Sequence, residues 1–440
     1  MSTVSLPWGK EKIELELPQS WRLAGVLEPA RLPGVADPRS EAERSLNDPT
    51  RSPRLSELAR AGQKIVLVID DGSRPTPVAK LLPAVLAELV RGGASLNQVT
   101  VIPALGVHRP MTREEIGQRL GMNNLDAPGG AHWENPDCDD PQKLVNLGTT
   151  KRGTSVLINK TVAQADLVIL IGCIEPHIIA SFGGGYKNLI PGLAGRETIA
   201  HNHCLNATPA TFNMVGQPIE NNPMRLDLEE GGRMLKPPVF LVNAVLNSAQ
   251  EVVRVVCGDP VAAHRAGVKV SAGIYGVKLP ELADVVITDS HPMDSDLRQG
   301  VKALANTTRA VRPGGVMITL VKANEGVGVF GLAERKLPVS QGGLRLLAPL
   351  LLPLVPKLKL KNMSEEERLF LYFALQAMRR ATLLMYGPSI PEANQKNMVF
   401  VEFVRQVQAG IQQAALKFPR KADVVVFPYG GSTYPIVSGG

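Results

Sequence analysis

Residues 64–74 read Lys-Ile-Val-Leu-Val-Ile-Asp-Asp-Gly-Ser-Arg, a short β-branched apolar run that ends in two carboxylates, a turn and an arginine. The run predicts a strand over 64–69 that is bounded by turn residues. A helical pattern follows over 77–91, with a proline at its start and Gly92 and Gly93 after its end, the usual places for these residue types. The segment therefore predicts the first strand, turn and helix of an α/β domain.

Apolar β-branched runs alternate with helical patterns over the rest of the chain, as is typical of βαβ units with a mostly parallel sheet. We predict an α/β fold of two domains, an N-terminal one over residues 1–265 and a C-terminal one over 270–440. Further strands are predicted over 99–104, 166–172, 239–245 and 252–256 in the first domain, and over 283–288, 316–321 and 423–427 in the second.

Two S/T-x-x-E capping boxes, at Thr112 and at Ser364, predict helix starts, and the second opens a long amphipathic helix over 364–386. The longest apolar stretch, 346–355, is interrupted by two prolines and is too short to span about 30 Å of hydrocarbon. We interpret it as a buried loop or short helix and expect no membrane partner.

The composition is that of an ordinary globular protein, because 44% of residues are apolar and 20% are charged, which excludes disorder and fibre. The net charge of +7 is dispersed without a long basic block, so it suits anionic small molecules, and we expect no nucleic-acid partner. The four cysteines form no C-x-x-C pair, and residues 1–17 lack the apolar core of a signal peptide. We therefore expect a cytoplasmic protein with reduced thiols.

Polar residues follow several predicted strands. Asp71 and Arg74 come after the first strand, His108 after the second, and Glu175 and His177 after the third. Ligands of open α/β sheets bind outside the carboxyl ends of the strands, so we expect these side chains to converge on one rim. Arg74 would hold a carboxylate or phosphate and Asp71 would orient it, the alternative being a helix cap with a surface arginine. The two histidines would act as exchangeable acid and base, as inversion at a carbon centre requires, although a lone loop histidine is more often structural.

A glycine-rich segment, Gly183, Gly184 and Gly185, precedes Lys187. Such glycines allow close backbone approach and can donate N–H groups to an anion, and a buried lysine beside them could bind phosphate or form a covalent link. The alternative is a flexible turn with an exposed lysine. The spacing does not fit a P-loop or a dinucleotide-binding motif.

His201 and His203 stand two residues apart, a weak signal for a metal site. Together with Glu175 they leave open a metal-dependent hydrolase, and a non-catalytic protein that binds a cofactor or metabolite is a third possibility. His264 lies on a predicted helix and is interpreted as structural.

Taken together, these motifs resemble the nickel-dependent lactate racemase family of 2-hydroxyacid racemases and epimerases, over most of the chain. The resemblance rests on Glu175-Pro176-His177, Lys187 ten residues later, His203 sixteen residues after that, and the upstream motifs Asp71-x-x-Arg74 and Gly106-x-His108-Arg109-Pro110.

The resemblance implies an isomerase with its active site in a cleft between two α/β domains. The implied cofactor is a nickel-pincer nucleotide, pyridinium-3-thioamide-5-thiocarboxylic acid mononucleotide with nickel, tethered to Lys187 and with His203 as the protein ligand of nickel. The implied reaction is proton-coupled hydride transfer through a 2-keto acid, and the implied partners are a 2-hydroxy acid and cofactor maturation enzymes. The other implied roles are acid and base for His108 and His177, substrate binding for Arg74, Gln299 and Lys302, and cofactor binding for Asp71, Gly183, Gly184 and Gly185.

Four positions depart from the usual pattern of this family. Near the tether, Ser181 stands where glycine is common and Gly183 where serine is common. Further on, His291 stands where an aromatic residue usually precedes the proline, and Arg298 where tyrosine is common before Gln299. His291 and Arg298 are therefore expected to contact the substrate. A bulkier, more polar or doubly acidic 2-hydroxy acid is at least as well predicted as lactate.

Overall fold

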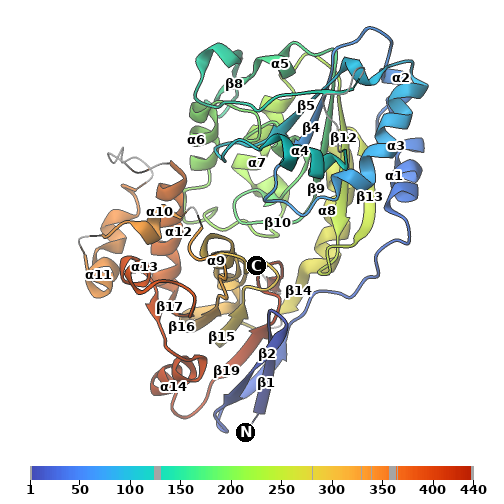
Figure 1. Ribbon diagram of the computed structural model, residues 1–440. Coiled ribbons are helices and arrows are strands. Elements are labelled where there is room, and N and C mark those ends of the chain that lie inside the picture. The colour runs from blue at the N-terminus through green and yellow to red at the C-terminus, as the bar shows by residue number, and fades with distance from the viewer. Residues whose placement is uncertain are drawn as a thin grey trace. The chain divides into compact units, whose positions relative to one another are not determined.

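The computed structural model describes residues 2–122, 130–279, 281–328, 330–337, 339–355, 363 and 365–437. The described chain divides into two compact units (Figure 1). Unit 1 comprises Met1–Ala30, Asn206–Gln217 and Tyr275–Gly440, and unit 2 comprises Arg31–Leu205 and Pro218–Ile274.

Unit 2 contains residues 64–74, the predicted first strand and turn. Its elements are α1 (Pro38–Asn47), α2 (Leu55–Leu58), β4 (Ile65–Asp70), α3 (Val78–Arg91), η1 (Leu96–Gln98), β5 (Val99–Ala104), α4 (Arg113–Leu120), β6 (His132–Trp133), η2 (Pro141–Lys143), β7 (Leu144–Thr149), β8 (Ser155–Asn159), α5 (Lys160–Ala163), β9 (Leu167–Cys173), β10 (Pro176–His177), β11 (Ser181–Phe182), η3 (Gly185–Asn188), α6 (Arg196–Cys204), η4 (Ile219–Asn221), α7 (Pro223–Gly232), β12 (Val239–Leu246), β13 (Val252–Gly258) and α8 (Ala262–Tyr275).

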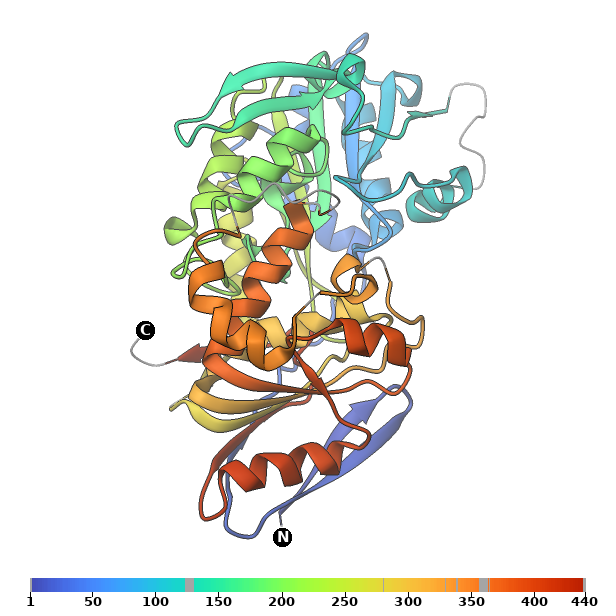
Figure 2. The ribbon, with the colours of Figure 1, turned by 90° about the vertical axis from the view of Figure 1, so that its left-hand side faces the viewer.

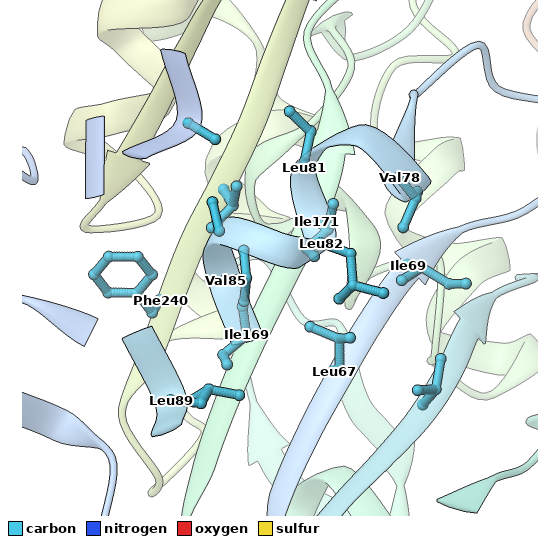
Figure 3. Packing of buried hydrophobic residues seen from close by; sticks show 14 of the residues in the cluster. Leu67, Ile69, Val78, Leu81, Leu82, Val85, Leu89, Ile169, Ile171 and Phe240 are labelled. Atoms are coloured by element: carbon cyan, nitrogen blue, oxygen red, sulfur yellow. The ribbon is translucent and has the colours of Figure 1, made fainter. Parts of the chain in front are cut away.

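The main sheet of unit 2 has the order β13-β12-β9-β4-β5-β6, and only β13 runs antiparallel to its neighbour among the described strands. Strand β4 is buried along its whole length. Leu67 and Ile69 of β4 pack with Ile169 of β9 and with Val85 and Leu89 of α3, as Figure 3 shows. The α3 helix forms because its apolar residues recur at helical spacing and so make one continuous face for the sheet.

Strand β4 is also where the chain changes direction across this sheet. From β4 the chain continues to β5 on one side, and β9 later pairs with β4 on the other side. Ligands of such sheets bind at this switch point, outside the carboxyl ends of the two strands. The polar residues after β4 and β9 therefore emerge at the same place.

Unit 1 contains the second parallel sheet, of order β18-β17-β16-β15-β19-β3. Its elements are β1 (Ser2–Trp8), β2 (Glu11–Leu17), β3 (Arg22–Val26), β14 (Gly276–Leu279), β15 (Ala283–Asp289), α9 (Leu297–Thr307), η5 (Thr308–Ala310), β16 (Val311–Leu320), α10 (Gly331–Glu334), α11 (Gln341–Leu351), α12 (Glu365–Arg380), β17 (Ala381–Tyr386), α13 (Glu392–Asn397), β18 (Glu402–Phe403), α14 (Val407–Lys417), β19 (Asp423–Phe427) and β20 (Tyr434–Val437).

The first thirty residues differ from the predicted division at 265–270. Strand β3 pairs with β19, and in both views the N-terminal hairpin lies beside the C-terminal elements (Figures 1 and 2). Val4, Leu6 and Leu15 of the hairpin are buried in the core of unit 1. The hairpin covers one face of the unit 1 sheet, most of whose strands come from the C-terminal part of the chain. This packing joins segments far apart in sequence, so local sequence patterns do not reveal it.

The α/β class with mostly parallel sheets is confirmed, and the eight predicted strands all form. The predicted helix over 364–386 is wrong in its last six residues, because α12 ends at Arg380 and β17 pairs in register with β16 over Ala381–Tyr386. Tertiary pairing overrides the helical pattern there. The capping residue Ser364 lies outside the described residues, whereas Thr112 caps α4 by accepting from the Glu115 amide.

The first six residues of the apolar stretch 346–355 form the end of α11, as the short-helix interpretation predicted. Its predicted burial holds for Ala348, Leu352 and Val355 but is wrong for the other face, since Leu346 is 80% and Leu350 is 68% exposed. Within the described residues, no helix has the length and apolar character needed to cross a membrane.

We expect Leu67→Ala to lower the free energy of unfolding by about 2–5 kcal/mol, because it opens a cavity beneath α3 in the core of unit 2. The matched control is Leu346→Ala at the exposed position of α11, where a change within about 0.5 kcal/mol is expected. Urea unfolding followed by circular dichroism measures both. Equal losses in the two variants would contradict the assigned core.

Candidate functional site

The turn after β4 is held by a buried carboxylate, Asp70. Its Oδ2 accepts hydrogen bonds from the Thr76 hydroxyl at 2.5 Å and from the Cys173 amide at 3.1 Å, which joins the ends of β4 and β9. Burial raises the pKa of Asp70. Arg119 of α4 donates to the carbonyl oxygens of Asp70 and Arg74, each at 2.9 Å. The turn is thus fixed from both sides, and Asp70 has a structural role.

Asp71 contacts the histidine that follows β5. Its Oδ2 lies 2.5 Å from His108 Nδ1, and its Oδ1 accepts from the Ser73 amide at 3.2 Å and the Ser73 hydroxyl at 2.6 Å. Burial opposes ionisation of Asp71, but the hydrogen bond and charge of His108 outweigh it, so the pKa of this carboxyl falls. Asp71 is therefore an ionised partner for His108.

Arg74 lies across the switch point from the end of β9. Its guanidinium NH1 is 2.6 Å from Glu175 Oε1. Burial alone would lower the pKa of Arg74, but the charges of Glu175, Asp70 and Asp71 raise it. The expectation that Asp71 orients Arg74 is corrected here, because Glu175 takes that position while His108 and Ser73 occupy the Asp71 oxygens. The permanent cation remains suited to a carboxylate or phosphate.

His177 forms the short strand β10, which pairs with β11. Its Nδ1 accepts hydrogen bonds from the backbone amides of Ile179 at 3.3 Å and Ala180 at 3.2 Å. The backbone itself therefore sets the orientation of this ring.

The glycine-rich turn is held by the protein. The Gly183 amide donates to the Glu175 carbonyl at 2.7 Å, and the Gly185 amide donates to Asn243 Oδ1 at 2.8 Å. The prediction that the amides of this turn bind an anion is therefore wrong for Gly183 and Gly185. Gly184 has φ +74°, and a Cβ there would lie 2.4 Å from Asn243 Oδ1, so only glycine fits.

Arg225, a fully buried arginine of α7, holds the glycine-rich turn through its backbone carbonyl groups. It donates to the carbonyl of Gly184 at 3.1 Å and to that of Phe182, and burial lowers its pKa to about 10. His264 of α8 lies 2.8 Å from the Gly183 carbonyl, which agrees with its predicted structural role. Sequence reasoning missed Arg225, because nothing in its helical segment distinguishes it from a surface arginine.

Lys187 lies in η3, directly after the turn. Burial and the charges of Arg74 and Arg225 lower its pKa to about 7. A large fraction of this lysine is therefore a neutral amine near pH 7, and a neutral amine is nucleophilic. This property supports the covalent alternative over an exposed lysine in a flexible turn.

His201 and His203 lie on α6 and make different contacts. The Nδ1 of His203 donates to the Ile199 carbonyl at 2.7 Å, so its Nε2 is the nitrogen that can ligate a metal. The Nδ1 of His201 contacts the Thr154 hydroxyl at 2.8 Å, and that hydroxyl donates to Asp227. Among the described residues, no group of three or more His, Cys, Asp and Glu could hold a metal ion. The hydrolase alternative thus lacks its ligand set.

The other predicted residues lie in unit 1. His291 follows β15, and its ring centroid is 5.3 Å from that of Tyr429, which follows β19. Arg298, Gln299 and Lys302 belong to α9, where the Gln299 amide donates to the capping Asp296. His291 therefore stands at the switch point of the second sheet, where β15 has β16 on one side and β19 on the other.

Residues 8–213 match the family model of the lactate racemase N-terminal domain. Lactate racemase of Thermoanaerobacterium thermosaccharolyticum is 30% identical over 335 residues, and that of Lactiplantibacillus plantarum is 30% identical over 341 residues. Each alignment covers 75% of this chain and 77% of the relative.

Solved structures agree with these matches. The lactate racemase apoprotein from T. thermosaccharolyticum superposes with a TM-score of 0.83 at 25% identity, over 99% of this chain and 100% of that chain. A Thermotoga maritima protein superposes with a TM-score of 0.65 at 17% identity, over 93% of this chain and 100% of that chain, and shows the fold alone.

We expect Lys187 to react with an amine reagent such as acetic anhydride at neutral pH, with a midpoint near pH 7. Deprotonation rises with pH, so labelling should be weak at pH 5 and nearly complete at pH 9, about two units either side of the midpoint. Mass spectrometry of peptides measures the labelled fraction, with the exposed Lys80 as internal control. A profile for Lys187 that coincides with that of Lys80 would contradict the buried, charge-repelled amine.

Proposed function

The chain belongs to the lactate racemase family, and from this premise we propose that it inverts the C2 centre of a 2-hydroxy acid by proton-coupled hydride transfer through a 2-keto acid. The observation that supports the proposal is the set of partners that Arg74, His108 and Lys187 have in unit 2. Arg74 is paired with Glu175, His108 is backed by Asp71, and Lys187 is largely neutral.

The chemistry explains why such a set is needed. A 2-hydroxy acid has no electron sink beside C2, so direct removal of the C2 proton is difficult, whereas departure of that hydrogen as hydride avoids a carbanion. The guanidinium of Arg74 would hold the substrate carboxylate. His108 and His177 would exchange a proton with the C2 oxygen, one taking it from the hydroxyl and the other returning it to the keto oxygen. Binding of the carboxylate would keep the planar intermediate within reach of both histidines.

The proposed cofactor is a nickel-pincer nucleotide. When bound, it supplies the hydride acceptor. Two observations fit it: Lys187 offers a neutral amine for the tether, and His203 is held in the tautomer that presents Nε2 to a metal. Since the amides of Gly183 and Gly185 are occupied, we do not assign the nucleotide phosphate to them. Loading the cofactor would require maturation enzymes.

The substrate is proposed to be more polar than lactate. Two positions of unit 1, His291 and Arg298, carry polar side chains where aromatic ones are usual in the family. We infer from these two replacements that a bulkier or doubly acidic 2-hydroxy acid is favoured over lactate, with Gln299 and Lys302 as further candidate substrate-binding residues.

We expect protein co-produced with maturation enzymes to carry added mass on Lys187 and about one nickel per chain. His203→Ala should lose nickel and keep the added mass, because it removes the metal ligand alone. His201→Ala is the matched control and should keep both, since His201 faces Thr154. Intact-mass and elemental analysis measure this, and equal nickel in the three proteins would contradict the role of His203.

We expect substrate deuterated at C2 to keep its label through inversion, because hydride leaves and returns without exchange with water. Racemisation of C2-deuterated lactate and malate, followed by chiral separation and mass spectrometry, tests this. Solvent hydrogen at C2 of the product would rule out hydride transfer. A protein that carries the cofactor yet inverts neither acid nor any other member of a broad panel would instead be a non-catalytic binder.

A further inference from the structure

His108 is held as one defined tautomer. Its Nδ1 lies 2.5 Å from Asp71 Oδ2, and Asp71 is ionised, so the carboxylate can only accept. The proton of the neutral ring is therefore on Nδ1, and the lone pair is on Nε2. Ser73 donates twice to the other carboxylate oxygen and fixes its direction.

His177 is held as the opposite tautomer. Its Nδ1 accepts from the amides of Ile179 and Ala180, and a backbone N–H can only donate. The lone pair is therefore on Nδ1, and the proton of the neutral ring is on Nε2. A proton on Nδ1 would face two other donors, so the ring must turn away from these amides before it can become an imidazolium.

We propose that Asp71 is the positioning residue that makes His108 the resting base, while His177 rests as a hydrogen-bond donor and takes or gives a full proton only after its ring leaves the amides of Ile179 and Ala180. This inference rests on the proposed function for its chemistry, but not for the tautomers themselves. It makes the histidine pair unequal, whereas a simple two-base scheme treats them alike.

From the resting tautomers, the reaction starts directly from one enantiomer, whereas the other enantiomer reacts by the reverse of the second half, after the His177 ring has turned. The O–H bond of the substrate breaks and its proton passes to His108 Nε2, while the C2 hydrogen would leave with both bonding electrons, for which the proposed cofactor would supply the acceptor. The products are the 2-keto acid and a His108 imidazolium, whose charge Asp71 balances. His177 Nε2–H meanwhile donates a hydrogen bond to the keto oxygen.

Completion of the inversion requires His177 to become an acid. One proton passes from His108 to water and one from water to His177 Nδ1, so the proton count is unchanged. As the C2–H bond re-forms on the other face, His177 Nε2 would give its proton to the oxygen. His177 then carries its proton on Nδ1, and exchange of that proton for one on Nε2 through water, as the ring returns to the amides of Ile179 and Ala180, restores the resting tautomer. Turning of the His177 ring is therefore a separate step of the cycle.

The tautomers can be measured on the cofactor-free chain by ¹⁵N NMR of histidine-labelled protein, assigned with His108→Ala and His177→Ala. We expect a protonated Nδ1 for His108 and a protonated Nε2 for His177. In Asp71→Asn, the ¹⁵N signals of His108 should show loss of the Nδ1–H tautomer, while the signals of His177 should stay unchanged. Asp71→Glu should restore the Nδ1–H tautomer of His108. The same tautomer at both histidines would overturn the proposal whatever the enzyme's activity.

Glutamine variants test the inequality in the holoenzyme, because a glutamine amide can donate a hydrogen bond but cannot take a proton. In single turnovers with each enantiomer of lactate and of malate, acid quenching releases the keto acid for detection. His177→Gln should form keto acid from one enantiomer in a fast phase. His108→Gln should form it from the other enantiomer more slowly, because the His177 ring must first leave the amides of Ile179 and Ala180. If the two variants form keto acid at the same rate, each from its own enantiomer, the pair is symmetrical and the proposal fails.

Asp71→Asn should lower kcat on the order of 10²-fold or more with little change in KM, because it disturbs the base and leaves Arg74 in place. Asp71→Glu should recover part of that loss, and Ser73→Ala is the milder control. A change in KM alone would assign Asp71 to substrate binding and contradict its positioning role. If wild-type holoenzyme forms no keto acid, the proposed function fails, and the NMR result still decides the tautomers.

Discussion

The site in unit 2 depends on one constraint: every charged side chain at the ends of two adjacent buried strands must have a partner. Strands β4 and β9 are buried along their whole length. Asp70 is the last residue of β4, Asp71 and Arg74 follow it, and Glu175 follows β9. An unpaired charge at this depth would be very costly. The Arg74–Glu175 ion pair and the bonds of Asp70 meet that requirement and also join the two loops.

Sequence patterns predicted much of this site because its logic is local. Apolar strands are visible as runs, and a residue that follows such a run must emerge at the sheet edge, which is why Arg74, His108 and His177 could be selected. The partners of these residues were less accessible. Asp71 was expected to pair with Arg74, three residues away, but the long-range contact to His108 takes it instead.

The failures share a physical cause. Arg225 carries no local signal of burial, and its role exists only because α7 passes beneath the glycine turn. Strand β17 continues a helical pattern in sequence and becomes a strand only because β16 offers it a pairing edge. The N-terminal hairpin likewise finds its core more than 250 residues away along the chain. In each case the deciding interaction joins segments that no sequence window contains.

The positive charges near the turn show how one site can hold both an anion binder and a nucleophile. Arg74 keeps its proton at any relevant pH, because Glu175 and the aspartates stabilise it and a guanidinium is intrinsically difficult to deprotonate. Lys187, in the field of Arg74 and Arg225, instead gives up its proton near pH 7. A second permanent cation at Lys187 would compete with Arg74 for a carboxylate and could not act as a nucleophile. The same buried positive charges therefore leave Arg74 protonated, as an anion binder needs, and Lys187 neutral, as a nucleophile needs. The fully buried Arg225 contributes by lowering the pKa of Lys187, and it need not contact any ligand to do so.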